Sequence, residues 1–310
     1  MNKEIEAKLD KIPILNVLVR FGKKVKIPGL QGMSLYDVLK MYSIGIVKGA
    51  LTTRAGGIAY SFFMAIFPFM LFILTVIPYV PIDGFQEGLL SFISEILPPK
   101  TFDAVDSVLV DILKNQYGGL LSFGFIASIF LMTNGVNAVF GGFEYSYHIK
   151  ETRSIIKAYI ISLAVSLVMA LFLVITVALT VFYKIGLDVL FEKGWVEDEL
   201  FWLKIGRGFL FVLMIFTTVS MLYRFGTKTG KHSRFFSPGA IFTTILSILT
   251  FYLFSYYVTE FAKYNQLYGS IGTLLILMLF IWLNAIILLL GFELNASIHS
   301  LQLKNKQPDS

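Results

Sequence analysis

Six long stretches of this 310-residue chain contain no charged residue, and this pattern constrains the fold more than any other feature. A helix needs roughly 20 apolar residues to cross the hydrocarbon core of a bilayer. An outer-membrane strand would instead alternate apolar and polar residues over about 10 residues. The sequence therefore predicts an all-α, polytopic membrane protein with six transmembrane helices. The predicted spans cover residues 56–81, 117–143, 158–183, 208–223 (extended upstream past Arg207), 235–259 and 264–292.

Lysine and arginine are distributed unevenly over the segments between these stretches. Nineteen of the 26 lie in residues 1–54, 144–157, 224–234 and the C-terminal tail. The intervening loops carry six lysines against twelve acidic residues. Because basic loops stay in the cytoplasm during insertion, the sequence predicts a multi-pass protein of the inner or plasma membrane with both termini in the cytoplasm.

Two amphipathic regions flank or interrupt the spans. Residues 34–53 have apolar residues at helical spacing, which predicts a helix that lies along the membrane interface or packs on the bundle. Residues 82–116 predict an external helical hairpin, because Pro98-Pro99 separates two amphipathic pieces. This hairpin either caps the bundle or moves as a lid. The predicted organisation is a cytoplasmic segment 1–54 with the interfacial helix, a transmembrane domain 55–299 containing the hairpin, and a cytoplasmic tail 300–310.

A few polar residues fall inside or at the ends of the apolar stretches, where polar groups are costly. Asn134 and Asn137 lie three apart and so share one helix face. One interpretation is hydrogen bonding between helices; the other is a polar cavity that opens toward the cytoplasm. For Glu293 the alternatives are pairing with a base such as Arg153 or Arg224 in the headgroup zone, or binding a coupling ion or headgroup. The candidate cavity residues are Asn134, Asn137, Glu144, Asn284, Glu293 and Asn295.

Pro68 and Pro78 lie in the first predicted span, and each removes a backbone hydrogen bond and can kink the helix. Kinked helices often border binding cavities, but such prolines are also common as simple bends. The basic segments predict a second feature, a cytoplasmic rim that attracts anionic lipid headgroups at about 1 kcal/mol per charge. The same charges also serve as the topology signal. The candidate headgroup contacts are Arg54, Arg153, Arg224, Lys228, Lys231 and Arg234.

Several kinds of chemistry are excluded by what the chain lacks. It has no Cys, and its three His residues are far apart, so no metal-ligand spacing, cofactor site or catalytic residue is predicted. No phosphate-binding Gly-x-x-x-x-Gly-Lys-Ser/Thr run is present. The predicted partners are membrane lipids and not nucleic acid, and a homo-oligomer or an envelope protein partner is left open.

Several segments together resemble the YihY/BrkB family of bacterial membrane proteins over roughly residues 35–300. They are Gly57–Pro68, Asn134–Tyr145 with Glu151 and Arg153, Tyr223-Arg-Phe, Ser237–Ala240, Tyr268–Gly272 and Gly291–Ala296. The resemblance implies a six-span integral membrane fold. Members have been linked to serum resistance and to export of envelope lipid or lipopolysaccharide. Some carry a ribonuclease BN label, against which this sequence argues, because it offers no His pair and no soluble domain for such a site.

Three functions remain to be distinguished. The first is a transporter or translocase of a lipid or amphiphilic solute, involved in envelope maintenance. The second is a non-transporting scaffold or regulator of envelope assembly. The third, a membrane enzyme such as a ribonuclease or lipid hydrolase, is disfavoured by the sequence.

Overall fold

The computed structural model describes residues 50–79, 115–146, 151–192, 199–228, 235–260 and 265–306. It also describes the single positions Lys24, Val25, Ser34, Tyr36, Asp37, Lys40, Tyr42, Val110, Asp111, His148 and Ile149. The interfacial helix predicted for residues 34–53 and the hairpin predicted for 82–116 therefore lie largely outside the described residues. Within the first of these regions, Ser34 and Asp37 exchange side-chain and backbone hydrogen bonds, as at the start of a helix.

Six helices in the described part of the chain are long and apolar enough to cross a membrane, as predicted. They are α4 (Leu51–Val76, followed by the 3₁₀ turn η1, Ile77–Tyr79), α7 (Gly118–Glu144), α8 (Ile155–Glu192), α9 (Glu199–Phe225), α10 (Pro238–Glu260) and α11 (Asn265–Lys306). Two of them are much longer than a span requires. At 38 and 42 residues, α8 and α11 reach roughly 57 and 63 Å, about twice the hydrocarbon thickness.

The first span begins earlier than predicted, at Leu51 rather than residue 56. Ala50, with a positive φ of 45°, separates α4 from the preceding segment. Pro68 lies inside α4, which continues to Val76, whereas Pro78 lies in η1, after that helix has ended. The prediction that Pro78 kinks the first span is therefore wrong, because this proline lies in the turn that follows the helix. The early start places Arg54 in the first turn of α4 rather than before the membrane.

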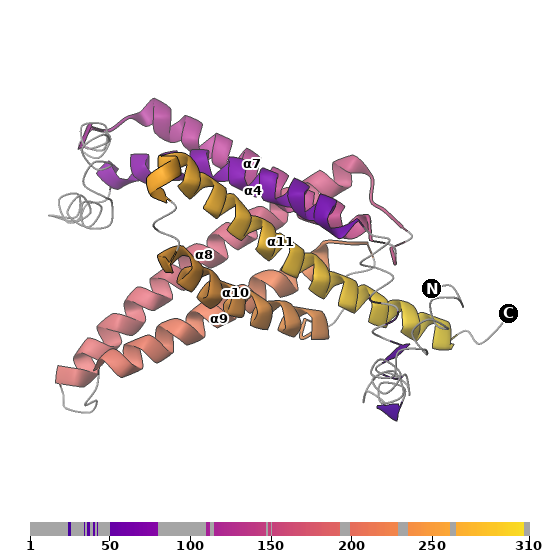
Figure 1. Cartoon of the computed structure of the whole chain (residues 1–310). Helices are drawn as coiled ribbons and strands as arrows, with labels where there is room; N and C mark the ends of the chain where they lie inside the picture. The colour runs from indigo at the N-terminus through magenta and orange to yellow at the C-terminus, as the bar shows by residue number, and fades with distance from the viewer. Residues whose placement is uncertain are drawn as a thin grey trace. The chain divides into compact units, whose positions relative to one another are not determined.

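The chain divides into two compact units, one formed by residues 1–59 and 136–310 and the other by residues 60–135. In the larger unit α8 packs against α9, α9 against α10 and α10 against α11. Figure 1 shows α8 and α9 as an antiparallel pair, and α10 and α11 as another. In the smaller unit, α4 and α7 approach closely where Gly124 faces the backbone of Phe72, and Phe72 also contacts the ring of Phe125.

The outer surfaces of α8, α9 and α10 are apolar. Leu171, Phe182, Phe209 and Tyr252 are all at least 60% exposed. A continuous surface of this kind would drive aggregation in water, but it is the normal surface of a helix that faces lipid. The exposed side chains therefore agree with the transmembrane assignment.

The contact between α10 and α11 depends on two glycines that face each other, Gly239 and Gly291, and on a polar cap at the start of α10. Ser237 precedes the helix and Pro238 occupies its first position, as is typical of helix starts. The hydroxyl of Ser237 accepts the Ala240 N–H, and Asn295 of α11 accepts the Gly239 N–H at 2.8 Å. Asn295 also donates to Ser237 at 2.9 Å. A side chain of the neighbouring helix thus satisfies the Gly239 N–H, which lipid could not do.

We predict that Gly291→Ala destabilises the protein by about 1–3 kcal/mol, because overpacking displaces well-packed neighbours. A Cβ at Gly291 would overlap Thr243 Oγ1 and lie 2.5 Å from the Tyr223 hydroxyl. Thermal unfolding of purified protein in detergent measures the loss. Gly208→Ala in α9 is the matched control, since a Cβ there meets nothing within 4 Å. Equal stability of the two variants would contradict the close contact of α10 and α11.

Candidate functional site

A buried ion pair joins the first and last membrane-spanning helices. Arg54 Nη2 of α4 lies 2.8 Å from Glu293 Oε1 of α11. The two side chains are 6% and 0% exposed, and Glu293 lies in the part of α11 that is assigned to the membrane. A charge in this setting is costly unless it is paired and hydrogen-bonded. The pair is therefore the most demanding polar feature among the described residues.

The end of α7 completes the coordination of both charges. Arg54 Nη1 donates to the carbonyl oxygen of Gly142 at 2.7 Å, and the Ser146 hydroxyl donates to Glu293 Oε2 at 2.8 Å. Each carboxylate oxygen thus has its own donor. Arg54 Nε is buried without a hydrogen-bond partner. We call the group formed by Arg54, Gly142, Ser146 and Glu293 the buried ion-pair cluster.

Tyr42, from the segment that precedes α4, lies within electrostatic range of this cluster. Burial and, to a smaller extent, the negative charge of Glu293 together raise the pKa of Tyr42 to about 12. The phenol is therefore neutral at physiological pH. A neutral phenol adds no second negative charge beside Glu293, so Arg54 remains its counter-ion.

Apolar residues seal the cluster one helical turn deeper in the membrane. Ile58 follows Arg54 by four residues and Leu289 precedes Glu293 by four, and both side chains crowd the position that a Cβ on Gly142 would occupy. Beside them, the rings of Phe143 and Phe292 stack at 4.2 Å, with Tyr223 packed edge-on against Phe143. The Tyr223 hydroxyl donates to the carbonyl of Leu288 at 2.7 Å. This packing closes the side of the pair that faces the interior of the bundle.

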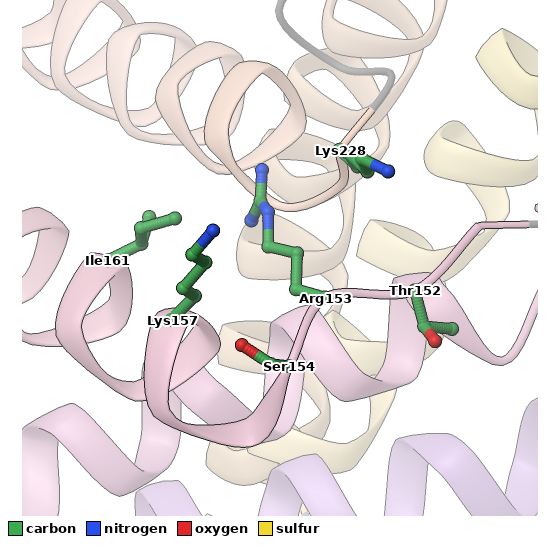
Figure 2. Close-up of a pocket in the computed structure, with 6 residues that line it drawn as sticks. All are labelled: Thr152, Arg153, Ser154, Lys157, Ile161 and Lys228. Carbon is green, nitrogen blue, oxygen red and sulfur yellow. The ribbon is translucent and has the colours of Figure 1, made fainter.

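A second polar feature, which we call the basic groove, lies at the start of α8. It has a volume of about 350 Å³ and is lined by Thr152, Arg153, Ser154, Lys157, Ile161 and Lys228. Figure 2 shows Arg153 and Lys157 pointing toward the end of α9, where Lys228 lies. Among the described residues, three cations and no acidic residue line this depression.

The groups around the groove hold Arg153 in place. Its two terminal nitrogens donate to the carbonyls of Phe225 and Thr227 at 2.5 Å each, at the end of α9. Its backbone N–H donates to Glu144 at 3.3 Å. Partial burial lowers the pKa of Arg153, while the charge of Glu144 acts in the opposite direction. Arg153 therefore fixes the start of α8 against the end of α9.

Lys228 is more accessible than Arg153. Its ammonium donates to the exposed carboxylate of Glu151 at 2.7 Å and holds the pKa of that carboxyl below its usual range. Both side chains are more than 60% exposed, so the pair is open to solvent or headgroups. Exposed pairs of this kind contribute little and exchange partners easily.

Five of the six candidate cavity residues have separate hydrogen-bond partners. Asn137 accepts a hydrogen bond from Ser162 of α8 at 3.3 Å, and Asn284 donates to the Phe280 carbonyl within its own helix. Glu144 lies beside Arg153 and Asn295 caps α10, as described above. Asn134 is half-buried and belongs to the smaller unit. For Asn137 and Asn295, hydrogen bonding between helices accounts for the polar side chain.

Two expectations about charged residues are corrected. One of the two alternatives for Glu293 is pairing with a base such as Arg153 or Arg224 in the headgroup zone, but Glu293 is fully buried and its partner is Arg54. Arg54 in turn was expected to contact headgroups, which does not fit its burial. Both differences arise because α4 starts at Leu51 and so carries Arg54 into the bundle.

The other candidate headgroup residues lie in different surroundings. Arg153 and Lys228 meet in the basic groove, and Arg224 is exposed near the end of α9. Lys231 and Arg234 lie outside the described residues. Sequence reasoning missed Lys157 as a member of the groove and Ser146 as a ligand of Glu293. The signal for Lys157 was its position one turn before Ile161 on an otherwise apolar helix face.

These features define a class of protein: an all-α, multi-pass membrane protein with an ion pair buried among its spans. The sequence profile described as Virulence factor BrkB matches residues 45–310, and the chain belongs to this family. This confirms the resemblance found in the sequence.

Relatives of known sequence agree with this assignment. The chain is similar to the ribonuclease-like protein YfkH of Bacillus subtilis, with 33% identity over 266 residues that cover 83% of this chain and 92% of the relative. It is also similar to UPF0761 membrane proteins. One from Aliivibrio salmonicida is 25% identical over 82% of this chain and 80% of its own length. One from Aggregatibacter aphrophilus is 26% identical over 80% and 87%. No solved structure matches the chain.

We predict that Arg54→Met and Glu293→Leu, made singly, each destabilise the protein by about 3–5 kcal/mol, because each leaves an uncompensated buried charge. The double variant, which removes both charges, recovers most of that loss. Thermal unfolding in detergent completes the double-mutant cycle. Glu151→Ala, which removes only the exposed pair with Lys228, costs at most about 1 kcal/mol. Additive losses at Arg54 and Glu293 would show that the two side chains do not interact.

Proposed function

We propose that the protein is a transporter or translocase of a lipid or amphiphilic solute, acts in envelope maintenance, and lies in the cytoplasmic membrane with both termini in the cytoplasm. The observation that carries the proposal is the buried Arg54–Glu293 pair. Ionisable residues inside membrane spans commonly mark pathways for substrates, ions or protons. The excess of basic residues in the connections on one side supports the proposed orientation.

Stability alone is a weak explanation for the pair. Replacing a buried ion pair with well-packed apolar residues is often neutral or stabilising, so a bundle that only needs to hold together has no need of one. A bundle that alternates between two packings can use such a pair, because the charges can separate in one packing only if other partners or water replace them. In the packing described here, the pair holds α4, the end of α7 and α11 together.

The alternative function is a scaffold or regulator of envelope assembly that transports nothing. A cluster that fixes three helices would also serve a rigid scaffold. What favours transport is that the cluster uses charges, which are costly to bury, where apolar packing would serve a scaffold equally well. Co-purification of a stoichiometric envelope protein, with no flux from the chain alone, would favour the scaffold.

Enzymatic activity is the least supported reading. The described residues include no group of three or more His, Asp or Glu that could hold a metal ion. One relative carries a ribonuclease-like name, and the name belongs to that protein. Among the described residues, Glu293 is buried between helices and paired with Arg54, and Glu151 is paired with Lys228 on the surface.

We predict that the double variant Arg54→Met/Glu293→Leu folds but loses flux by about tenfold or more, because it keeps the closed packing and removes the charges. The assay follows fluorescent phosphatidylglycerol, and separately an amphiphilic solute, across proteoliposomes that contain only this protein. Glu293→Gln should lose flux as well. His299→Gln, an exposed change on the same helix, is the control. Wild-type flux from a folded double variant would refute a transport role for the pair.

A further inference from the structure

We propose that the basic groove binds the phosphate-bearing headgroup of an anionic amphiphile, whose apolar part lies along the exposed face of α8. The groove would be the headgroup site of the transported substrate. Binding of the amphiphile does not depend on the proposed function; only its identity as the transported substrate rests on it. The groove itself is defined by its lining residues and its charge.

The charge and size of the groove suit a phosphate. Lys157, Lys228 and Arg153 line the groove with three positive charges, and Thr152 and Ser154 add hydroxyls. The volume of about 350 Å³ is large enough for a headgroup. Charge-assisted hydrogen bonds from such donors are the strongest that proteins make to phosphate.

The groove has one cation fixed by hydrogen bonds and two that are exposed. Arg153 is held by the carbonyls of Phe225 and Thr227, so it forms a fixed wall. Lys157 is exposed, and Lys228 has an exposed partner in Glu151. A phosphate that entered the groove would displace Glu151 from Lys228, exchanging one weak surface pair for contacts with several donors. Glu151 is thus a competitor of the ligand.

The apolar face above the groove indicates an amphiphile rather than a free phosphate. Positions 157, 161, 164, 168 and 171 share one face of α8. This face begins with Lys157 and continues through Ile161 and Ala164 to Val168 and Leu171, the last two being 49% and 60% exposed. A cation followed by exposed apolar residues along a membrane helix matches a headgroup followed by an acyl chain.

The groove also lies where a headgroup would be found. The membrane-spanning part of α8 begins at Ile155, so Arg153 and Lys157 stand at the boundary between the polar and apolar layers. Cations at this depth attract anionic headgroups, and their long stems can reach the interface.

The test measures binding of phosphatidylglycerol, phosphatidylcholine and inorganic phosphate to the purified full-length protein in neutral detergent. We expect phosphatidylglycerol to bind best. Lys157→Gln and Lys228→Gln should each weaken its binding about fivefold, the usual effect of one cation near a headgroup. Glu151→Gln should strengthen binding, by about threefold, because it frees Lys228. Lys184→Gln, the same change at an exposed position near the other end of α8, should have no effect.

Several outcomes would overturn the inference. Equal losses in Lys157→Gln and Lys184→Gln would show that general charge, and not the groove, attracts the lipid. Weaker binding in Glu151→Gln would contradict the competition. Tight binding of inorganic phosphate without preference for phosphatidylglycerol would refute the amphiphile. Binding loss in Lys157→Gln with unchanged flux would remove the groove from the transport path while leaving transport intact. Specific binding without flux by the wild type would refute transport alone.

Discussion

The buried ion pair between Arg54 and Glu293 is the interaction on which the larger unit of the structure depends. It joins the first turn of α4 to the last membrane-spanning turns of α11, and the end of α7 supplies a ligand to each charge. Because neither lipid nor the surrounding apolar side chains can solvate an unpaired charge, these three elements must meet in this register. Ile58, Leu289 and the stacked Phe143–Phe292 rings then pack around a point that the charges have already fixed.

Polar groups at two helix ends of the larger unit are satisfied by side chains in the same way, at lower cost. Asn295 and Ser237 satisfy the start of α10, and Arg153 satisfies carbonyls at the end of α9. The first N–H groups and the last carbonyl groups of a helix have no partner within the helix, and water is scarce at the membrane. Neighbouring side chains therefore form hydrogen bonds with them. The difference between the two polar features suggests a division of roles. The ion-pair cluster is sealed, whereas the basic groove is open, so we propose recognition at the groove and conformational control at the pair.

The spans could be predicted from the sequence because a long uncharged run in a membrane protein forms a helix that crosses the bilayer. Their ends and partners could not. Arg54 follows a basic segment and so looked like part of the cytoplasmic rim, but Ala50 ends the preceding segment and α4 starts one turn before Arg54. Glu293 was recognised as unusual, yet its partner lies 239 residues away, a distance that no local pattern encodes. The contact between Gly239 and Gly291 could not be predicted either, because it exists only once α10 and α11 are packed.

The most direct test of this account is cross-linking in native membranes. The chain has no Cys, so Ile58→Cys and Leu289→Cys can be introduced without background while Arg54 and Glu293 remain intact. These positions lie one turn deeper than the two charges and converge on Gly142. A short bifunctional thiol reagent should join them efficiently, and should not join Ile58→Cys to a cysteine at Leu279, which lies on the exposed side of α11. Cross-linking of the second pair but not the first would contradict the proposed meeting of α4 and α11.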